Sequence, residues 1–285
     1  MVRKPAVAGT FYAGNRDSLL RQIEECFRHP LGPGTVPETA AQGERKIVGL
    51  INPHAGYMYS GAVAAWGFGE LIKREKPETV IILGPNHRGF GSPLAIMSEG
   101  AWKTPLGEVQ INTKVASQLL DSLPSILEDD AKAHEREHSL EVQLPFLQYG
   151  YGSDFKIVPL CMAEQTYTTS TQIGRAILEL LKENPNLILV ASTDLTHYQP
   201  QHIAEKEDRK IIEAILSGNP RNLNKLLMAY DFSMCGPGPV MVVMEAICSS
   251  GLGKAKLLKY ATSGNITGDY SAVVGYASLI LERNL

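Results

Sequence analysis

Short, almost entirely apolar runs recur along the chain, and each contains only four to six residues. Runs of this length that are rich in Val, Ile and Leu are typical of strands buried on both faces of a sheet. We therefore predict strands at 47–51, 80–83, 155–160 and 187–191. A longer apolar run, 272–281, predicts a late, buried strand.

Between these runs, apolar residues recur with the 3.6-residue period of a helix that buries one face. The stretches with this period are 18–28, 62–73, 113–120, 171–183 and 204–216. Alternating strands and helices predict an α/β fold with a largely parallel central sheet and helices on both faces. No linker or low-complexity tract interrupts the pattern, so we expect residues 1–285 to form a single domain.

Composition excludes several classes of protein. The 285 residues carry 27 basic and 30 acidic side chains, a net charge of -3 that gives no electrostatic reason to expect nucleic acid or an anionic membrane as a partner. No apolar run approaches the roughly 20 residues of a membrane helix, and the first residues, MVRKPAVAGTFYAG, lack the apolar core of a signal peptide. The four cysteines form no close pair, which favours reduced thiols and a cytoplasmic location.

Polar side chains with catalytic or metal-binding capacity follow three of the predicted strands. His54 and His87 each come shortly after a strand, and Asp194 and His197 follow a third. In an open α/β sheet, ligands bind beyond the carboxyl ends of the strands. A single loop histidine usually only hydrogen-bonds to backbone, but three such strand ends together favour a site, and neutral imidazole is the commonest metal ligand.

Cys235 is the cysteine with the most suggestive setting. It lies in the Gly/Pro-rich segment SMCGPGP, directly before a predicted helix at 240–248. A helix N-terminus favours a thiolate, which suits a nucleophile or a metal ligand. Cys26, Cys161 and Cys248 have no such setting, and we expect them to be small buried apolar residues.

The segment His134-Glu135-Arg136-Glu137-His138 matches the zinc-protease pattern H-E-x-x-H. We interpret the match as accidental, because the two middle positions of that motif are normally uncharged and here are Arg136 and Glu137. The more informative part is EHSLE at 137–141, which opens an amphipathic stretch and contains His138.

Six ordered motifs resemble the Memo family, and they span nearly the whole chain. They are AVAGTFY at 6–12, NPHAGY at 52–57, LGPNH at 83–87, EHSLE at 137–141, STDLTHY at 192–198 and the dipeptide Cys235-Gly236. The resemblance implies a fold similar to that of class III extradiol ring-cleavage dioxygenases, which hold non-haem iron.

By this resemblance, His54, His87 and Cys235 occupy the metal-ligand positions of the family, while His138, Asp194 and His197 line the same pocket. The related dioxygenases have a carboxylate as third ligand where this chain has a cysteine. The resemblance also implies an AMMECR-type protein and a radical-SAM protein as partners.

Three functions fit these residues. The first is a metal-dependent redox enzyme using iron or copper, with zinc as a further option, in which His138 or His197 serves as acid or base and Asp194 orients an imidazole. The second is a metal-free hydrolase or transferase with Cys235 as nucleophile, His197 as base and Asp194 as orienting residue. The third is a non-catalytic scaffold that binds a peptide or phosphopeptide.

Overall fold

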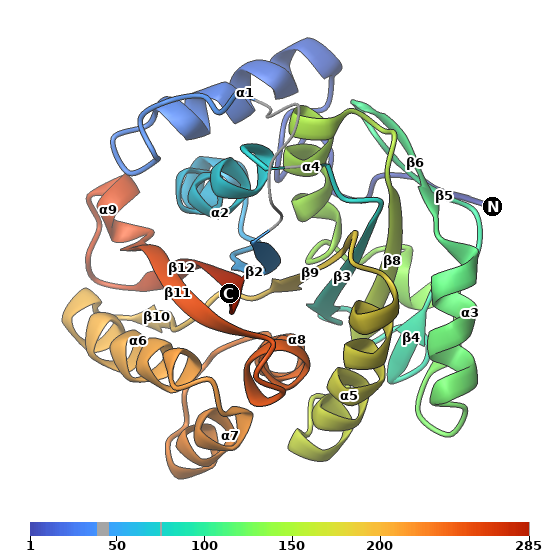
Figure 1. Ribbon diagram of the computed structural model, residues 1–285. Coiled ribbons are helices and arrows are strands. Elements are labelled where there is room, and N and C mark those ends of the chain that lie inside the picture. Colours follow the sequence, from blue (N-terminus) through green and yellow to red (C-terminus); the bar gives the residue numbers. More distant parts are fainter. Residues whose placement is uncertain (39–45, 75, 285) are drawn as a thin grey trace.

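The computed structural model describes residues 1–38, 46–74 and 76–284. Its strands are β1 (Val2–Arg3), β2 (Ile47–Asn52), β3 (Thr79–Pro85), β4 (Leu94–Ile96), β5 (Ala101–Thr104), β6 (Gly107–Ile111), β7 (Glu128–Asp129), β8 (Lys156–Met162), β9 (Leu187–Ser192), β10 (His197–Gln199), β11 (Gly253–Thr262) and β12 (Val273–Arg283). They form one mixed sheet in the order β1-β5-β6-β8-β3-β9-β2-β12-β10, to which β4, β7 and β11 are added by side pairings (Figure 1).

The centre of the sheet is parallel, as predicted. Strands β8, β3, β9 and β2 pair in parallel, and they are the four strands that the short apolar runs indicated. Every residue in them is buried except Lys156, the charged residue that interrupts the third run. Burial on both faces explains why these strands show continuous rather than alternating hydrophobicity.

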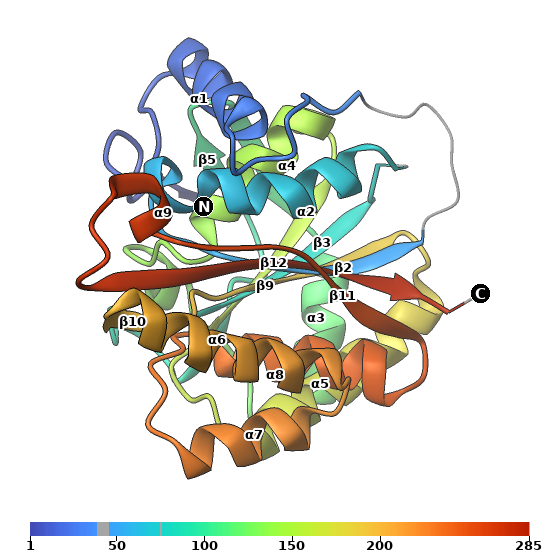
Figure 2. The same cartoon turned by 90° about the vertical axis from the view of Figure 1, so that its left-hand side faces the viewer.

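Helices cover both faces of the sheet. On one face lie α1 (Arg16–Arg28), α2 (Ala62–Ile72) and α4 (Leu144–Tyr151), whose apolar side chains share one core with the sheet. On the other face, a second core contains α3 (Thr113–Ser122), α5 (Tyr167–Glu183), α6 (Gln201–Leu216), α7 (Pro220–Ala229) and α8 (Pro237–Val243). Figure 2 shows these two layers above and below the sheet, which confirms the predicted α/β architecture.

The predicted late strand is β12, and it lies inside the sheet between β2 and β11. Both pairings are antiparallel, so the sheet is mixed towards this side. The sequence did not indicate β11, because its apolar positions are interrupted by Lys254, Lys256 and Lys259. Lysines on an outer strand discourage pairing with another chain.

Several short helical turns complete the chain. They are the π-helical turns at Tyr57–Gly61 and Met244–Ser249, the 3-10 turns at Ala131–His134 and Glu141–Gln143, and α9 (Gly264–Thr267). The turns on either side of residues 135–140 show that no continuous helix carries the H-E-x-x-H segment, in agreement with its interpretation as an accidental match.

The N-terminal arm is fastened to the loop at 134–141 by a buried ion pair. Arg3 is 4% exposed, and its guanidinium donates to the Glu141 carboxylate and to the carbonyl oxygens of His134 and Glu137. The same carboxylate accepts hydrogen bonds from the Ala6 and Val7 N–H groups and from the Tyr12 hydroxyl. One buried carboxylate therefore joins the start of the chain to the loop that carries His138.

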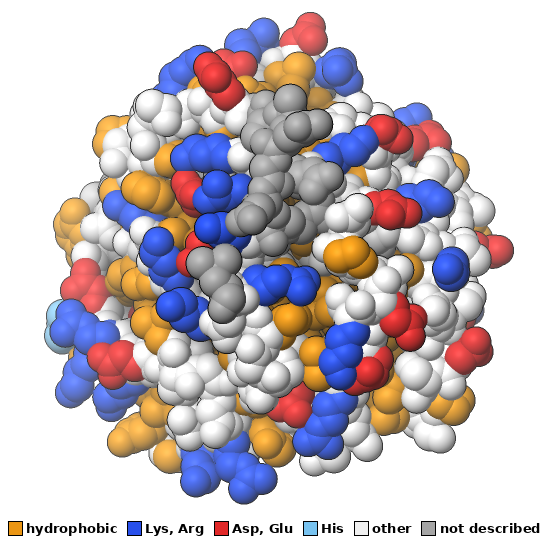
Figure 3. Space-filling view, in the orientation of Figure 1, with side chains coloured by type: hydrophobic (Ala, Val, Ile, Leu, Met, Phe, Trp, Pro, Cys, Tyr) orange, Lys and Arg blue, Asp and Glu red, His pale blue; other side chains and the backbone are white. Residues whose placement is uncertain are grey.

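Basic and acidic side chains are interspersed on the face of the molecule shown in Figure 3. This mixture is what the small net charge of -3 leads one to expect. Within the described ranges, no helix has both the length and the apolar character needed to cross a bilayer.

Candidate metal centre

Adjacent parallel strands bring the candidate residues to one edge of the sheet. His54 lies two residues beyond β2, His87 two residues beyond β3 and Asp194 two residues beyond β9. Because β3, β9 and β2 are neighbours with the same direction, their carboxyl ends meet at that edge. The fourth candidate, His138, reaches the same place from the loop fastened by Arg3.

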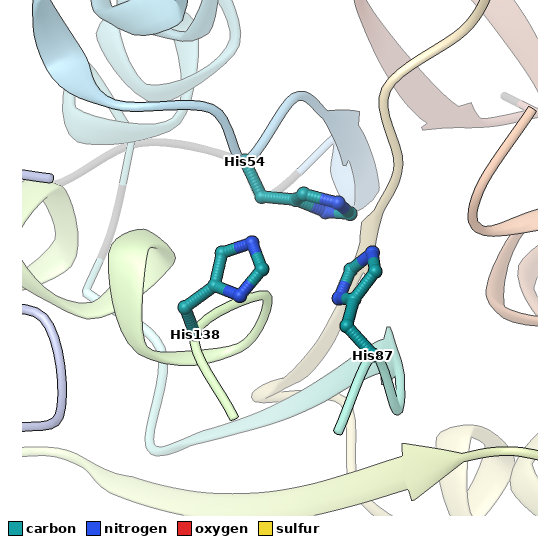
Figure 4. Close-up of side chains that lie close together, drawn as sticks. All are labelled: His54, His87 and His138. Carbon is teal, nitrogen blue, oxygen red and sulfur yellow. The ribbon is translucent and has the colours of Figure 1, made fainter. Parts of the chain in front are cut away.

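Three imidazoles converge there. One ring nitrogen each from His54, His87 and His138 lies within 4.8 Å of the other two. The ring centroids are 5.0 Å apart for His54 and His87, 5.5 Å for His54 and His138, and 4.7 Å for His87 and His138. Figure 4 shows the rings facing a common space from three separate segments. An ion with bonds of about 2.1 Å separates its ligand nitrogens by about 3–4 Å, so this group could bind a metal with small side-chain rotations.

The His54 ring is oriented from behind by Ser192. The Ser192 hydroxyl donates to the Ser139 carbonyl oxygen over 2.7 Å and accepts from the Gln143 amide over 2.8 Å. Its remaining lone pair therefore accepts the Nδ1–H of His54, 2.8 Å away. This assignment leaves the Nε2 lone pair of His54 facing the site, which is the arrangement that a metal ligand requires.

The His87 ring is oriented by the buried carboxylate of Glu137. Oε1 lies 3.0 Å from His87 Nδ1, and Oε2 accepts the His87 N–H over 2.6 Å. Oε1 also accepts the N–H groups of His138 and Ser139. Burial alone would raise the pKa of Glu137, but the His87 hydrogen bond and the neighbouring imidazoles and N–H groups lower it to about 2. The carboxylate is therefore ionised and holds the Nδ1 side of the His87 ring.

Burial keeps the rings of His54 and His138 neutral. It lowers the pKa of His54 well below its ordinary value, and the neighbouring imidazoles act in the same direction. The pKa of His138 falls to about 4, mainly through burial, although Glu137 opposes the shift. A neutral imidazole offers the lone pair that a metal needs.

Cys235 lies against His54. Its Sγ is 3.2 Å from His54 Nε2 and accepts the Asp194 N–H over 3.1 Å. The expected thiolate is not favoured, because burial and the nearby Asp194 raise the pKa of the Cys235 thiol. The helix that follows, α8, has only seven residues, so its dipole is small compared with this loss of hydration. Two of the predicted ligands, His54 and His87, belong to the three-histidine group. The third, Cys235, does not belong to it, but its sulfur lies beside His54.

Asp194 and His197 are close to the site but are not paired with one another by a hydrogen bond among the described residues. Asp194 Oδ1 accepts the His54 N–H over 2.8 Å, and burial raises the pKa of Asp194 to about 6. His197 Nδ1 lies 2.8 and 2.9 Å from the carbonyl oxygens of Leu195 and Ser233. Asp194 therefore positions the loop of His54, whereas a hydrolase relay would need it to orient His197.

A cavity of about 600 Å³ opens over the three histidines. His197 and Asp194 also line it, together with the aromatic residues Phe11, Tyr59, Tyr198 and Tyr276. Phe11 packs against the His138 ring with centroids 4.7 Å apart, so the N-terminal arm contributes to both the cavity wall and the position of His138.

A family model described as Memo-like protein matches residues 3–280. The chain belongs to the Memo-like family. It is 48% identical over 284 residues to a MEMO1 family protein of Methanopyrus kandleri, covering 99% of this chain and 100% of that one. Further MEMO1 family proteins, from Ignicoccus hospitalis and Thermotoga neapolitana, are 47% and 45% identical and cover at least 98% of each chain.

A solved structure, that of an uncharacterized protein from Escherichia coli K12, has a similar fold. The TM-score is 0.54 at 14% sequence identity, covering 81% of this chain and 99% of that one. At this identity the likeness concerns the fold alone. The match of the family model to residues 3–280 confirms the resemblance to the Memo family over nearly the whole chain.

Sequence reasoning overlooked the groups that orient the histidines of this Memo-like chain. Glu137 and Ser192 lie within the quoted motifs, but nothing in their spacing assigns them to His87 and His54. Gln143 was not noticed at all, because it lies in an otherwise apolar stretch. His134, by contrast, is fully buried against Trp102 and takes no part in the group.

Proposed function

We propose that this protein is a metal-dependent redox enzyme whose ion is held by His54 and His87, with His138 and the Cys235 sulfur as further donors. The observation that carries the proposal is the convergence of three imidazoles, two of which, His54 and His87, are held in place by hydrogen bonds from behind the ring. The ligands of a metal ion must point their lone pairs at one common position, whereas histidines with a purely structural role need not.

The donor set is compatible with iron, copper and zinc, and the proposed redox role requires iron or copper. Imidazole suits iron, copper and zinc, and a thiolate beside two imidazoles adds affinity for copper and zinc. A redox-active ion at this site would supply electron transfer and an open coordination position for a substrate. The chain's own residues supply the rest: Glu137 and Ser192 hold the rings, and His197 lines the cavity where it can exchange a proton with a bound molecule.

Metal content tests the proposal directly. Protein purified without oxygen and then reconstituted separately with iron(II), copper(I) and zinc(II) is expected to retain about one ion per chain after desalting. Element analysis measures this ratio. Retention of no ion under any of the three conditions, in protein that stays folded, would contradict the proposal.

A second prediction concerns Glu137, which touches no ion itself. Glu137→Gln is expected to lower metal affinity by about 10- to 100-fold, because the amide can no longer accept all the N–H groups that surround the carboxylate. Competition with a chromophoric chelator, using cobalt(II), measures the change. Glu135→Gln, at an exposed position in the same loop, is the matched control and should bind as tightly as wild type.

A further inference from the structure

Tyr276 stands on the cavity wall with its ring buried and its hydroxyl free. The residue is 2% exposed, and its ring packs in a small apolar cluster with Val63 and Ala261. It lies on β12, and its side chain lines the cavity over the three histidines. Among the described residues, the hydroxyl has no hydrogen-bond partner.

The other well-buried tyrosines are different. The Tyr12 hydroxyl donates to a carboxylate, and those of Tyr57 and Tyr151 donate to backbone carbonyl oxygens. The half-buried Tyr260 also donates to a carboxylate. A buried phenol normally finds such a partner, because leaving its hydroxyl unpaired costs stability. The Tyr276 hydroxyl differs because it is not one of the fully buried polar atoms: it opens onto the cavity, where it can donate to a molecule bound there.

The charge of the cavity lining limits what that molecule can be. No lysine or arginine is among the described residues that line the cavity, so a ketone oxygen or a singly charged carboxylate suits the wall at Tyr276 better than a phosphate dianion. The groups around the Tyr276 hydroxyl are Tyr59, Tyr198 and the buried Asp194. Burial, with Asp194 adding to the effect, raises the pKa of Tyr276, so the phenol keeps its proton and acts as a neutral donor.

We propose that Tyr276 is a substrate-binding residue, which donates a hydrogen bond to a carboxylate or ketone oxygen of a small organic molecule whose other end lies at the three histidines. This inference rests on the proposed metal site and names the substrate class for it. The substrate has two oxygen-bearing ends: one reaches the ion, and the other is recognised by the phenol on the cavity wall.

Matched small acids test the inference in cobalt(II)-loaded protein, whose visible absorption changes when a ligand joins the ion. The probes are malonate, succinate and glutarate, each paired with the monocarboxylate of equal length, and levulinate, which replaces one carboxylate of succinate by a ketone. We expect at least one two-ended probe to bind wild type more tightly than its one-ended partner. Tyr276→Phe should weaken that probe by about 10- to 100-fold if it is a dicarboxylate and by about 2- to 10-fold if it is levulinate.

Monocarboxylate affinities and the cobalt content should be unchanged in Tyr276→Phe, because neither depends on the phenol. Tyr270→Phe, at an exposed tyrosine outside the cavity lining, is the matched control and should behave as wild type throughout. Two results would overturn this inference and leave the proposed metal site standing. One is equal affinity of wild type and Tyr276→Phe for every two-ended probe, and the other is the absence of any preference for two-ended probes in wild type. Failure of wild type to bind cobalt would overturn the proposed metal site and this inference with it.

Discussion

Replacing His54 and His87 together by alanine is expected to abolish metal retention, with affinity reduced by at least about 1,000-fold. Removing two imidazole donors forfeits a large share of a binding free energy that for comparable protein sites is about 10–16 kcal/mol. The two residues come from the ends of β2 and β3, which lie on either side of β9, and each is oriented by a separate partner. Element analysis after reconstitution and desalting measures the loss.

The control for this pair is a double variant at two histidines outside the three-histidine group, His29→Ala with His202→Ala. It should retain metal as wild type does. Single variants then separate the further donors: loss of a sulfur-to-cobalt absorption band in Cys235→Ser identifies the thiolate as a ligand, and weaker retention in His138→Ala identifies the third imidazole. A folded His54→Ala, His87→Ala protein that still holds one ion per chain would refute the site.

Arg3→Met is expected to destabilise the folded protein by about 3–5 kcal/mol, since it removes one partner of a buried ion pair and leaves the other charge uncompensated. The Glu141 carboxylate is fully buried and would keep only its bonds to two backbone N–H groups and the Tyr12 hydroxyl. The carbonyl oxygens of His134 and Glu137 would also lose their donor. Urea unfolding measures the change as a lower midpoint at an unchanged slope.

Arg28→Met is the matched control, because Arg28 pairs with Glu24 at the surface with side chains that are 61% and 36% exposed. Exposed pairs contribute only about 0–1 kcal/mol, so this variant should unfold close to wild type. If both variants unfold at the same urea concentration, the Arg3–Glu141 pair does not hold the arm as inferred.

Much of the fold could be predicted from hydrophobic pattern. The runs at 47–51, 80–83, 155–160 and 187–191 are the parallel centre of the sheet, because strands buried on both faces must be apolar throughout. Strands that are short or partly exposed, such as β5 and β11, gave no comparable signal. Their pairing depends on neighbours that are distant in the sequence.

The candidate site was predicted in part. His54, His87 and Asp194 could be placed together because strand ends of a parallel sheet share one edge. The strand pattern does not place His138 beside them, because its loop is held by Arg3, 135 residues earlier in the chain; only the family resemblance put it in the same pocket. The prediction of a thiolate at Cys235 rested on the helix that follows it. The surrounding protein instead excludes water from the thiol and raises its pKa.

The sequence by itself determined which segments form the parallel centre of the sheet, at which edge their polar ends meet, and to which family the chain belongs. These properties depend on local composition and on order along the chain. Only the tertiary structure decided which ring nitrogens face one another, which carboxylate and hydroxyl orient them, and that the Tyr276 hydroxyl has no partner. Those properties depend on distances between segments that are far apart in sequence, and on burial, which changes the pKa of a side chain without changing its identity.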